Sequence, residues 1–349
     1  MQIQTDVVVV GAGQAGLAMS YHLKGSGIPH IVVEKQEAPG GSWPSYYDSL
    51  TLFSPARHSS LPGYPFPGGG KRYPRRDDVV QYLRDYARKF GLPIQVRSEV
   101  ERIEFGTDRH LVCLRNGPPI SAGAIVVASG GFNAPYVPDV AGTAKFCGEI
   151  LHSASYRNTE PFHGKRVVVV GAANSAVQIA YELSAVADVT LATRERIRFA
   201  PQRILGLDFH DWLKWSRLER SSWLSDQSTP VLDDGRYRAA IRTGALRRRQ
   251  MFKEISKDSV IWPDGECQRV DSIIYATGYR FNAPFLEGTP ALDDNGHIHQ
   301  HHGASSSVAG LFYLGIPLQR NFASATLRGV GNDASAILPV IQQHIQQMA

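Results

Sequence analysis

Hydrophobic and polar positions along the chain fall into blocks that predict strands followed by helices. Two runs of β-branched residues, at 6–10 and 166–170, have the unbroken apolar character of strands buried in a parallel sheet. Each run leads through a short turn into an amphipathic stretch, at 14–24 in the first case and at 174–185 in the second. The pattern therefore predicts the same strand–turn–helix unit twice.

Weaker patterns predict the elements around these two units. The passage at 134–166 is broken by prolines and is expected to be an interdomain linker, whereas 201–260 carries aromatic and basic helical patterns and is expected to be a helical insert. The insert either covers a substrate cavity or is a plain helical subdomain. The other expected elements are a helix at 79–90 with Asp77 as its N-cap, a β-meander at 94–114, strands at 124–128, 272–280 and 310–315, and a last helix at 333–347.

The turn of the first unit, in VVVVGAGQAG, has the glycine spacing of a dinucleotide-binding site. Gly11 makes the tight turn, Gly13 lets the backbone approach a pyrophosphate, and Gly16 permits close packing of helix on strand. The N-terminus of the helix offers free N–H groups and a positive dipole to the phosphates. Glu34 lies 23 residues after Gly11, where a carboxylate accepts hydrogen bonds from both hydroxyls of an unphosphorylated ribose. This unit is predicted to bind FAD or NAD.

The turn of the second unit, in VVVVGAANSA, differs at its middle position, where Ala173 replaces glycine. Arg194 lies 23 residues after Gly171, and a guanidinium there suits a ribose 2′-phosphate; the alternative is a solvated residue at the end of a strand. The methyl group of Ala173 should hold a pyrophosphate slightly further out. The turn is then either a looser, exchangeable NADP site or a decayed relic, and the retained Asn174 and Ser175 favour the exchangeable site.

These two units predict an α/β fold with two nested Rossmann-like dinucleotide-binding domains. The first turn is expected to belong to residues 1–160 and 281–349. The second turn is expected to belong to residues 161–280, with the helical insert around 201–260.

Composition and charge argue against several classes of function. The chain has 37 Lys and Arg against 32 Asp and Glu, a formal net charge of +5, and its one basic run, at 242–250, is interpreted as a solvated helix face rather than a nucleic-acid patch. No apolar run reaches the roughly 18 residues needed to span a bilayer. The N-terminus enters a strand at once without the features of a leader peptide, so we expect a cytoplasmic protein without membrane or nucleic-acid partners.

Metal and thiol chemistry find no support in the sequence. Cys113, Cys147 and Cys267 are isolated, so neither a redox dithiol nor a zinc site is predicted. The histidine run at 297–302 follows the turn sequence DDNG and is interpreted as a solvated hairpin rather than a zinc site. No serine lies in the context of a nucleophile elbow.

A motif before the second unit carries a family resemblance. In KFCGEILHSASYR, Phe146, Gly148, His152 and Tyr156 match the pattern FxGxxxHxxxY that identifies flavin-containing monooxygenases. GGSW at 40–43 and ATGY at 276–279 are also similar to that family, so the resemblance covers nearly the whole chain. The chain resembles short bacterial members, which are themselves similar to plant indolepyruvate-type monooxygenases. Tyr156 falls where Baeyer–Villiger enzymes typically have tryptophan, which argues against that branch.

The resemblance implies a larger FAD-binding domain, residues 1–160 and 281–349, with a smaller NADP-binding domain, residues 161–280, inserted in it. It also implies NADPH- and O2-dependent oxygenation of soft nucleophiles, namely thioether sulfur and amine nitrogen, through a C4a-hydroperoxyflavin. Two turns are then needed because two nucleotides must meet, and only one of them has to exchange. FAD and NADPH are the implied cofactors, with NADH left open as a second donor, and the implied partners are a small thioether or amine and O2. Phe53 falls where the family often has an asparagine near the flavin edge, so assistance to oxygen activation by that side chain is not carried over. His152 is expected to pack at the domain junction, and the helix beginning near Asn332 to point its positive end at the reduced flavin.

The candidate catalytic residues are Phe53 and Asn174. No further side chain is named, because the flavin supplies most of the chemistry. Together, the turns and the resemblance give these cofactor-binding candidates: Gly11, Gly13, Gln14, Ala15, Gly16, Glu34, Lys35, Gly41, Ser42, Trp43, His58, Val100, Ala128, Gly130, Gly315, Gly171, Asn174, Ser175, Arg194, Ala276, Thr277 and Gly278.

Two other classes of function remain open. One is an NAD(P)H-dependent flavin reductase that passes electrons to a disulfide, a quinone or an iron protein, of which the missing CxxC rejects only the dithiol version. The other is a flavin-binding regulator without turnover, for which Ala173 and Phe53 would be marks of decay. The sequence leaves the physiological substrate undecided, and equally whether the chain forms a homodimer.

Overall fold

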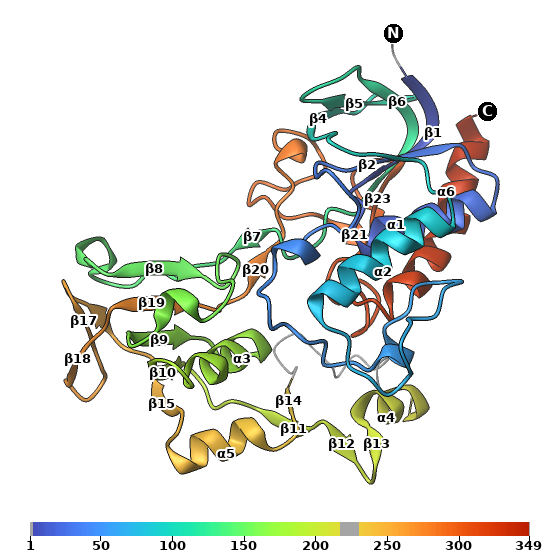
Figure 1. The fold of residues 1–349 in the computed structure, drawn as a ribbon. Coiled ribbons are helices and arrows are strands. Elements are labelled where there is room, and N and C mark those ends of the chain that lie inside the picture. The colour runs from blue at the N-terminus through green and yellow to red at the C-terminus, as the bar shows by residue number, and fades with distance from the viewer. Residues whose placement is uncertain (1–2, 217–229, 349) are drawn as a thin grey trace.

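The computed structural model describes residues 3–216 and 230–348, which form two α/β units side by side (Figure 1). A nine-stranded sheet forms the centre of the larger unit, with β21-β22-β23-β6-β1-β2-β3 as its strand order and β4 and β5 joined beside β6. The pairs among β3, β2, β1, β6 and β23 are parallel, whereas β4, β5 and β6 form an antiparallel meander. The meander expected at 94–114 is confirmed for β4 and β5, but its start is wrong because β3 pairs parallel with β2. The strands are β1 (Ile3–Val10), β2 (His30–Val33), β3 (Ile94–Gln95), β4 (Val100–Glu104), β5 (His110–Leu114), β6 (Ile120–Val127), β21 (Gln300–His301), β22 (Ala304–Ser305) and β23 (Leu311–Tyr313).

The larger sheet is covered on both faces because its central strand is apolar on both faces. Val7 and Val9 of β1 pack in one core with helices α1, α2 and α6, while Val8 and Val10 pack in a second core with the meander strands. Figure 1 shows the three helices together on one side of the sheet. These helices are α1 (Gln14–Gly25), α2 (Arg76–Lys89) and α6 (Val330–Met348).

A parallel five-stranded sheet in the order β15-β10-β9-β19-β8 forms the smaller unit. Val167 and Val169 of β9 pack with helix α3, and Val168 and Val170 pack toward a small antiparallel sheet on the other face. The elements are β8 (Glu149–His152), β9 (Arg166–Val170), α3 (Asn174–Leu183), β10 (Asp188–Thr193), β15 (Arg247–Gln250), β19 (Ser272–Tyr275) and the small-sheet strands β16 (Glu254–Ile255), β17 (Ser259–Ile261) and β18 (Cys267–Arg269).

The chain passes between the two units twice, at β7 (Ala134–Pro135) and β20 (Tyr279–Arg280), which pair antiparallel with each other. Strand β8 belongs to the smaller sheet, although it precedes residue 160, where the sequence placed the boundary. The passage at 134–166 is therefore more than a linker. Its strand was missed because EILH is only four residues long and carries little apolar signal.

The insert is less helical than the sequence indicated. It contains the helices α4 (Phe209–Ser216) and α5 (Arg236–Thr243), and residues 217–229 of the expected insert lie outside the described residues. Helix α5 ends because Gly244 adopts a left-handed φ of +78°, and the basic run after it forms β15 at the edge of the smaller sheet. The interpretation of the basic run at 242–250 as a solvated helix face is therefore wrong. The other strands around the insert are β11 (Phe199–Pro201), β12 (Arg203–Ile204), β13 (Leu207–Asp208) and β14 (Val231–Asp233).

The start of helix α2 differs from the prediction, whereas the predicted hairpin is present. Helix α2 begins at Arg76 rather than at 79, and the predicted Asp77 cap is wrong: Arg75 is the N-cap, and its N–H donates to the Asp78 carboxylate at 2.8 Å. The hairpin at 297–302 is confirmed by the antiparallel pairing of β21 with β22. Within 3–216 and 230–348, no helix has both the length and the apolar character needed to cross a membrane.

Candidate functional site

The first turn lies at the carboxyl end of β1 and is built so that two of its positions accept only glycine. Gly11 has a left-handed φ of +103°, and a Cβ there would lie 2.8 Å from the Ala128 carbonyl oxygen. A Cβ on Gly16 would lie 1.8 Å from the Gly11 carbonyl oxygen. The helix α1 therefore packs directly on the turn, and its free N–H groups face outward from the end of β1.

A second loop closes over this turn. The Gly40 N–H donates to the Ala12 carbonyl at 3.0 Å, and a Cβ on Gly41, whose φ is +55°, would lie 2.8 Å from Gly13 Cα. Gln14 ties the loop down, because its Oε1 accepts a hydrogen bond from Trp43 Nε1 at 2.8 Å. The Nε2 of the same side chain donates to the Ala325 carbonyl at 3.1 Å, which links turn, loop and the segment before α6.

Glu34 lies just after β2, where the sequence predicted a ribose reader. It is 3% exposed, and its carboxylate accepts the Ala12 N–H at 2.7 Å and the Gln36 N–H at 2.9 Å, one on each oxygen. A carboxylate has about four lone-pair positions, so both oxygens keep acceptor capacity for ribose hydroxyls. Lys35 beside it is exposed.

Other FAD candidates gather at the same edge of the sheet, because β1, β2, β6 and β23 are parallel and end there. Gly315 follows β23, and a Cβ there would lie 2.7 Å from the Ala15 side chain, whereas Gly130 has φ +84° with open space beside it. Among described atoms the buried Ser129 Oγ has no hydrogen-bond partner, so this edge holds a polar atom that a bound group can satisfy. The cradle of backbone, carboxylate and hydroxyl fits FAD.

Three further FAD candidates lie on three different segments: the covering loop, the start of β4 and the loop that contacts the insert. The hydroxyl of Ser42 donates to Tyr46 at 3.2 Å within the covering loop. Val100 begins β4, two residues after Ser98, whose N–H donates to the Glu34 carbonyl at 2.8 Å. His58 instead contacts Asp211 of the insert, with 2.7 Å between Nε2 and Oδ1.

The second turn repeats the backbone of the first but is open. Gly171 has φ +143°, and a Cβ there would lie 2.4 Å from the Ala276 carbonyl oxygen. Ala173 is the exposed N-cap of α3, with an extended backbone that any residue adopts. Asn174 Oδ1 is buried and has no hydrogen-bond partner among the residues the structure describes, as expected of a group that completes its bonding with a nucleotide. Ser175 follows it in the first turn of α3.

Residues after β19 border this second turn, because β19 is the parallel neighbour of β9. The Ala276 N–H donates to the Val170 carbonyl at 2.8 Å, and Thr277 Oγ1 donates to the Tyr136 carbonyl. Gly278 has φ +84° and accepts the Tyr136 N–H at 3.0 Å. These contacts place all three predicted positions between the second turn and the crossing strands.

Arg194 lies directly after β10, exposed to solvent, and the Gly171 N–H donates to the carbonyl of Ala192 two residues before it. Arg248 of β15 approaches the same place: its guanidinium donates to Thr193 Oγ1 at 2.8 Å and to the Glu195 carbonyl at 3.0 Å. Arg248 was not predicted as a phosphate ligand, because the basic run at 242–250 was interpreted as a helix face. The strand register Leu191↔Arg248 brings this second guanidinium beside the predicted 2′-phosphate position.

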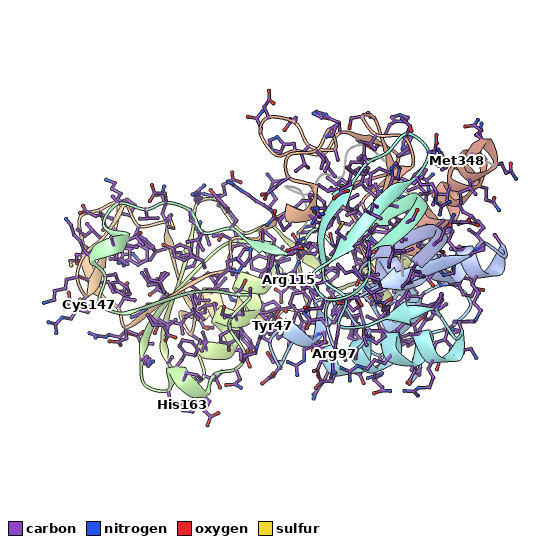
Figure 2. The ribbon with its side chains drawn as sticks, turned by 90° about the horizontal axis from the view of Figure 1, so that it is seen from above. Tyr47, Arg97, Arg115, Cys147, His163 and Met348 are labelled. Carbon is purple, nitrogen blue, oxygen red and sulfur yellow. The ribbon has the colours of Figure 1, made fainter. Side chains whose placement is uncertain are left out.

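The two units are joined by hydrogen bonds around Tyr47, which Figure 2 shows between them. The Tyr47 hydroxyl donates to Gln178 Oε1 at 2.6 Å, and burial raises the pKa of this phenol, so it remains a donor. Ser49 donates to Glu182 Oε2 at 2.8 Å. The same oxygen accepts Tyr156 at 3.0 Å, so the last residue of the family motif, itself in the core of the smaller unit, orients Glu182 for its bond to Ser49.

His152 packs at the crossing strands, which confirms the expected junction position. Its Nδ1 accepts the Ala154 N–H at 3.1 Å, so the ring proton is on Nε2, which donates to the Gly278 carbonyl at 3.0 Å. Burial lowers the pKa of His152 and keeps it neutral. Both nitrogens are used by the backbone, which leaves neither for proton transfer.

Phe53 lies against the insert. It is 38% exposed, and its ring stacks on the ring of His210, with centroids 5.9 Å apart and planes 18° apart. Asp211 of the same insert bonds Arg57 and His58 together. The insert therefore packs on the loop at 53–58, a contact that no sequence pattern indicated.

The N-terminus of α6 faces this region but carries a carboxyl group. Asp333, in the first turn, is fully buried, and neither of its carboxyl oxygens has a hydrogen-bond partner among the described residues. Arg320 lies 3.6 Å away, and burial raises the pKa of Asp333. The favourable helix dipole predicted for a reduced flavin is strongest when this carboxyl is protonated.

Comparison with known proteins agrees with this architecture. The family model described as pyridine nucleotide-disulphide oxidoreductase matches residues 8–315. An uncharacterized CzcO-like oxidoreductase of Geobacillus kaustophilus is 35% identical over 99% of this chain and its own full length. An indole-3-pyruvate monooxygenase of Oryza sativa subsp. japonica is 28% identical over 98% of this chain and 88% of its own.

A solved structure supports the assignment over the whole length. The flavin-containing monooxygenase from Stenotrophomonas maltophilia superposes with a TM-score of 0.87 at 30% identity and covers 100% of both chains. The match extends to both nucleotide turns and to the junction between the units. The chain therefore belongs to the pyridine nucleotide-disulphide oxidoreductase family and is a flavin-dependent oxidoreductase with the FAD/NAD(P)-binding fold of the flavin-containing monooxygenases.

Proposed function

We propose that this protein is an NADPH- and O2-dependent monooxygenase that oxygenates soft nucleophiles, thioether sulfur and amine nitrogen. For a thioether the balanced reaction consumes the thioether, O2, NADPH and a proton in equal amounts, and it yields the sulfoxide, water and NADP⁺. One oxygen atom goes to sulfur, the other leaves as water, and NADPH supplies two electrons. FAD, when bound, supplies the hydride acceptor and the activation of O2.

The difference between the two turns supports the assignment of FAD and NADPH, and the full-length likeness to a flavin-containing monooxygenase carries the choice of reaction. The first turn is closed by Gly41 and Trp43, as suits a nucleotide that stays bound. The second leaves Ala173 exposed, as suits a cosubstrate that exchanges in each cycle. A resident FAD and an exchangeable NADPH are what this reaction needs.

The residues of the chain bind and orient the two nucleotides. The glycine turns and the N-termini of α1 and α3 receive the pyrophosphates, Glu34 receives the FAD ribose, and Arg194 receives the 2′-phosphate of NADPH. The hydrogen bonds of Tyr47 and Ser49 to α3 fix the two units relative to each other, so that nicotinamide and flavin meet. Phe53 contributes an apolar wall that excludes water and donates no hydrogen bond.

A reductase is the competing function, since a flavin and an exchangeable nicotinamide serve both. The three cysteines are free, with Cys113 buried and Cys147 and Cys267 exposed, and among the described residues none pairs into a dithiol. A disulfide reductase with its own dithiol is thereby disfavoured. The monooxygenase is preferred because the full-length structural relative at 30% identity is a flavin-containing monooxygenase.

The test is to supply the purified FAD-loaded protein with NADPH, ¹⁸O2 and methyl tolyl sulfide. We expect sulfoxide that carries one ¹⁸O atom, together with a spectral species distinct from oxidised and reduced flavin when reduced protein meets O2 in the presence of NADP⁺. Rapid NADPH oxidation without sulfoxide or N-oxide across a panel of thioethers and amines would favour the reductase. Failure of NADPH to reduce the flavin would favour the regulator.

A further inference from the structure

The insert holds Phe53 from two directions. The imidazole of His210 stacks on its ring, with 5.9 Å between centroids and 18° between planes. Gln202 Nε2 donates to the Phe53 carbonyl at 3.0 Å. Side chain and backbone of one partly exposed residue are therefore both fixed by a segment about 150 positions later in the chain.

Gln202 and His210, the two residues that contact Phe53, both donate hydrogen bonds to the buried carboxylate of Asp208. Asp208 is 3% exposed, and its Oδ1 accepts His210 Nδ1 at 2.8 Å and the His210 backbone N–H at 2.8 Å. Its Oδ2 accepts Gln202 Nε2 at 3.1 Å and the hydroxyl of Tyr73. Four donors converge on two oxygens, which is close to the full capacity of a carboxylate.

The charge state of this network follows from its hydrogen bonds. Burial alone would raise the pKa of Asp208, but the hydrogen bonds from His210 and Tyr73 bring it to about 2, so the group is ionised. Burial lowers the pKa of His210 and keeps the imidazole neutral, with its proton on the nitrogen that faces Asp208. A neutral, oriented ring is a good stacking partner for Phe53.

The loop that carries Phe53 packs into the core of the larger unit, the core that also contains the first turn. Leu52 and Ala56, on either side of Phe53, pack in the same core as Ala12 of the first turn. A Cβ on Gly331, in the first turn of α6, would lie 2.5 Å from Pro62, so the loop continues along the N-terminus of that helix. Phe53 thus lies on a loop whose neighbouring residues pack in the core of the larger unit, and Phe53 itself contacts the insert.

We propose that Gln202, Asp208 and His210 are positioning residues that seat Phe53 as a wall beside the flavin, and that this seating sets the share of turnovers that yield oxygenated product rather than H2O2. The inference rests on the proposed function. An aromatic wall excludes water and small quenchers from the edge of a bound flavin. Since the insert belongs in sequence to the smaller unit, the wall is complete only when both units are in place.

The test compares Phe53→Ala, His210→Ala and the double variant, all loaded with FAD. Each single variant should raise the H2O2 formed per NADPH and the iodide quenching constant of flavin fluorescence about two- to tenfold, the range expected for loss of one aromatic contact. The double variant should match Phe53→Ala alone, because His210 acts through Phe53. Trp212→Phe removes a hydrogen bond to the Ile204 carbonyl within the same insert but outside the Asp208 network, and it should leave both readouts within about twofold.

Gln202→Met is the second probe if His210→Ala fails to fold, because it removes both of its hydrogen bonds at a partly exposed site. It should raise iodide quenching in the same direction. Additive effects in the double variant, or an unchanged quenching constant in His210→Ala and Gln202→Met, would overturn the inference. If the wild-type protein binds FAD but oxygenates no nucleophile, the proposed function fails, while iodide quenching still decides whether the insert positions Phe53.

Discussion

The contact between the covering loop and the first turn can be tested with Gly41→Ala. Gly41 has φ +55°, and the added Cβ would lie 2.8 Å from Gly13 Cα, a backbone atom that cannot rotate away. A left-handed conformation costs a non-glycine residue about 1–2 kcal/mol, and forcing extra atoms into a packed contact costs about 1–3 kcal/mol more. The second cost falls on the cradle, because loop and turn must separate to make room.

The assay measures the dissociation constant for FAD and the melting temperature of the holoprotein. If the packing cost of about 1–3 kcal/mol is borne by the FAD-bound state, the dissociation constant rises about 5- to 150-fold. Gly27→Ala is the matched control: its φ is +69°, and no described atom lies within 4 Å of its added Cβ, so it carries only the conformational cost. Equal loss of melting temperature in both variants, with FAD affinity unchanged in Gly41→Ala, would refute the closed cradle.

Three further predictions follow from the second turn and from an ion pair. Arg194→Ala should lower kcat/KM for flavin reduction by NADPH about tenfold, the lower part of the range for an exposed charged hydrogen bond, and should change kcat/KM for NADH little. Arg248→Ala should act in the same direction. An unchanged NADPH/NADH ratio of kcat/KM in both variants would contradict the 2′-phosphate assignment. Ala173→Gly should lower KM for NADPH about fivefold, as about 1 kcal/mol of packing strain is relieved; a KM that stays or rises would show that the turn is adapted to alanine. Hydrogen bonds from Arg166 bring the pKa of Asp271 to about 2 from its ordinary 3.8, so this pair stabilises the fold above the ordinary pKa and the benefit is lost as pH falls toward 2. Arg166→Ala should therefore lower the melting temperature at pH 7 and flatten its decline with acid, and parallel curves for both proteins would rule this out.

The parts of the fold that the sequence predicted are those with a strong local signal. The strands β1 and β9 are continuous valine runs buried on both faces, and their helices α1 and α3 begin at the predicted residues. Strand β15, by contrast, reads RRRQ and is mostly exposed, so nothing in its own pattern distinguishes it from a basic helix face. Its pairing with β10 is set by the glycine that ends α5 and by the tertiary position of that edge.

The candidate site divides in the same way. The glycines and Glu34 could be predicted from their spacing. A pyrophosphate and a ribose fix how far apart their protein partners must be along one strand–turn–helix–strand path. The contacts of Gln202 and His210 with Phe53 join segments with no fixed offset, so no motif could reveal them. What the sequence did offer was a local anomaly, two aspartates and a histidine in the apolar stretch DFHDWLKW, which a buried network explains.

The backbone conformation of the two turns does not require glycine at position 13 or alanine at position 173. Gly13 and Ala173 are both N-caps with nearly the same extended backbone, at φ −77° and ψ −173° in the first turn and φ −97° and ψ −178° in the second. A Cβ on Gly13 would meet only Gly41 Cα, at an ordinary 3.6 Å, so the protein itself tolerates alanine at either position. The choice of glycine in one turn and alanine in the other is therefore not dictated by packing within the protein. We propose that a pyrophosphate lies closer to the first turn than to the second, and that this difference in approach lets one nucleotide stay while the other leaves.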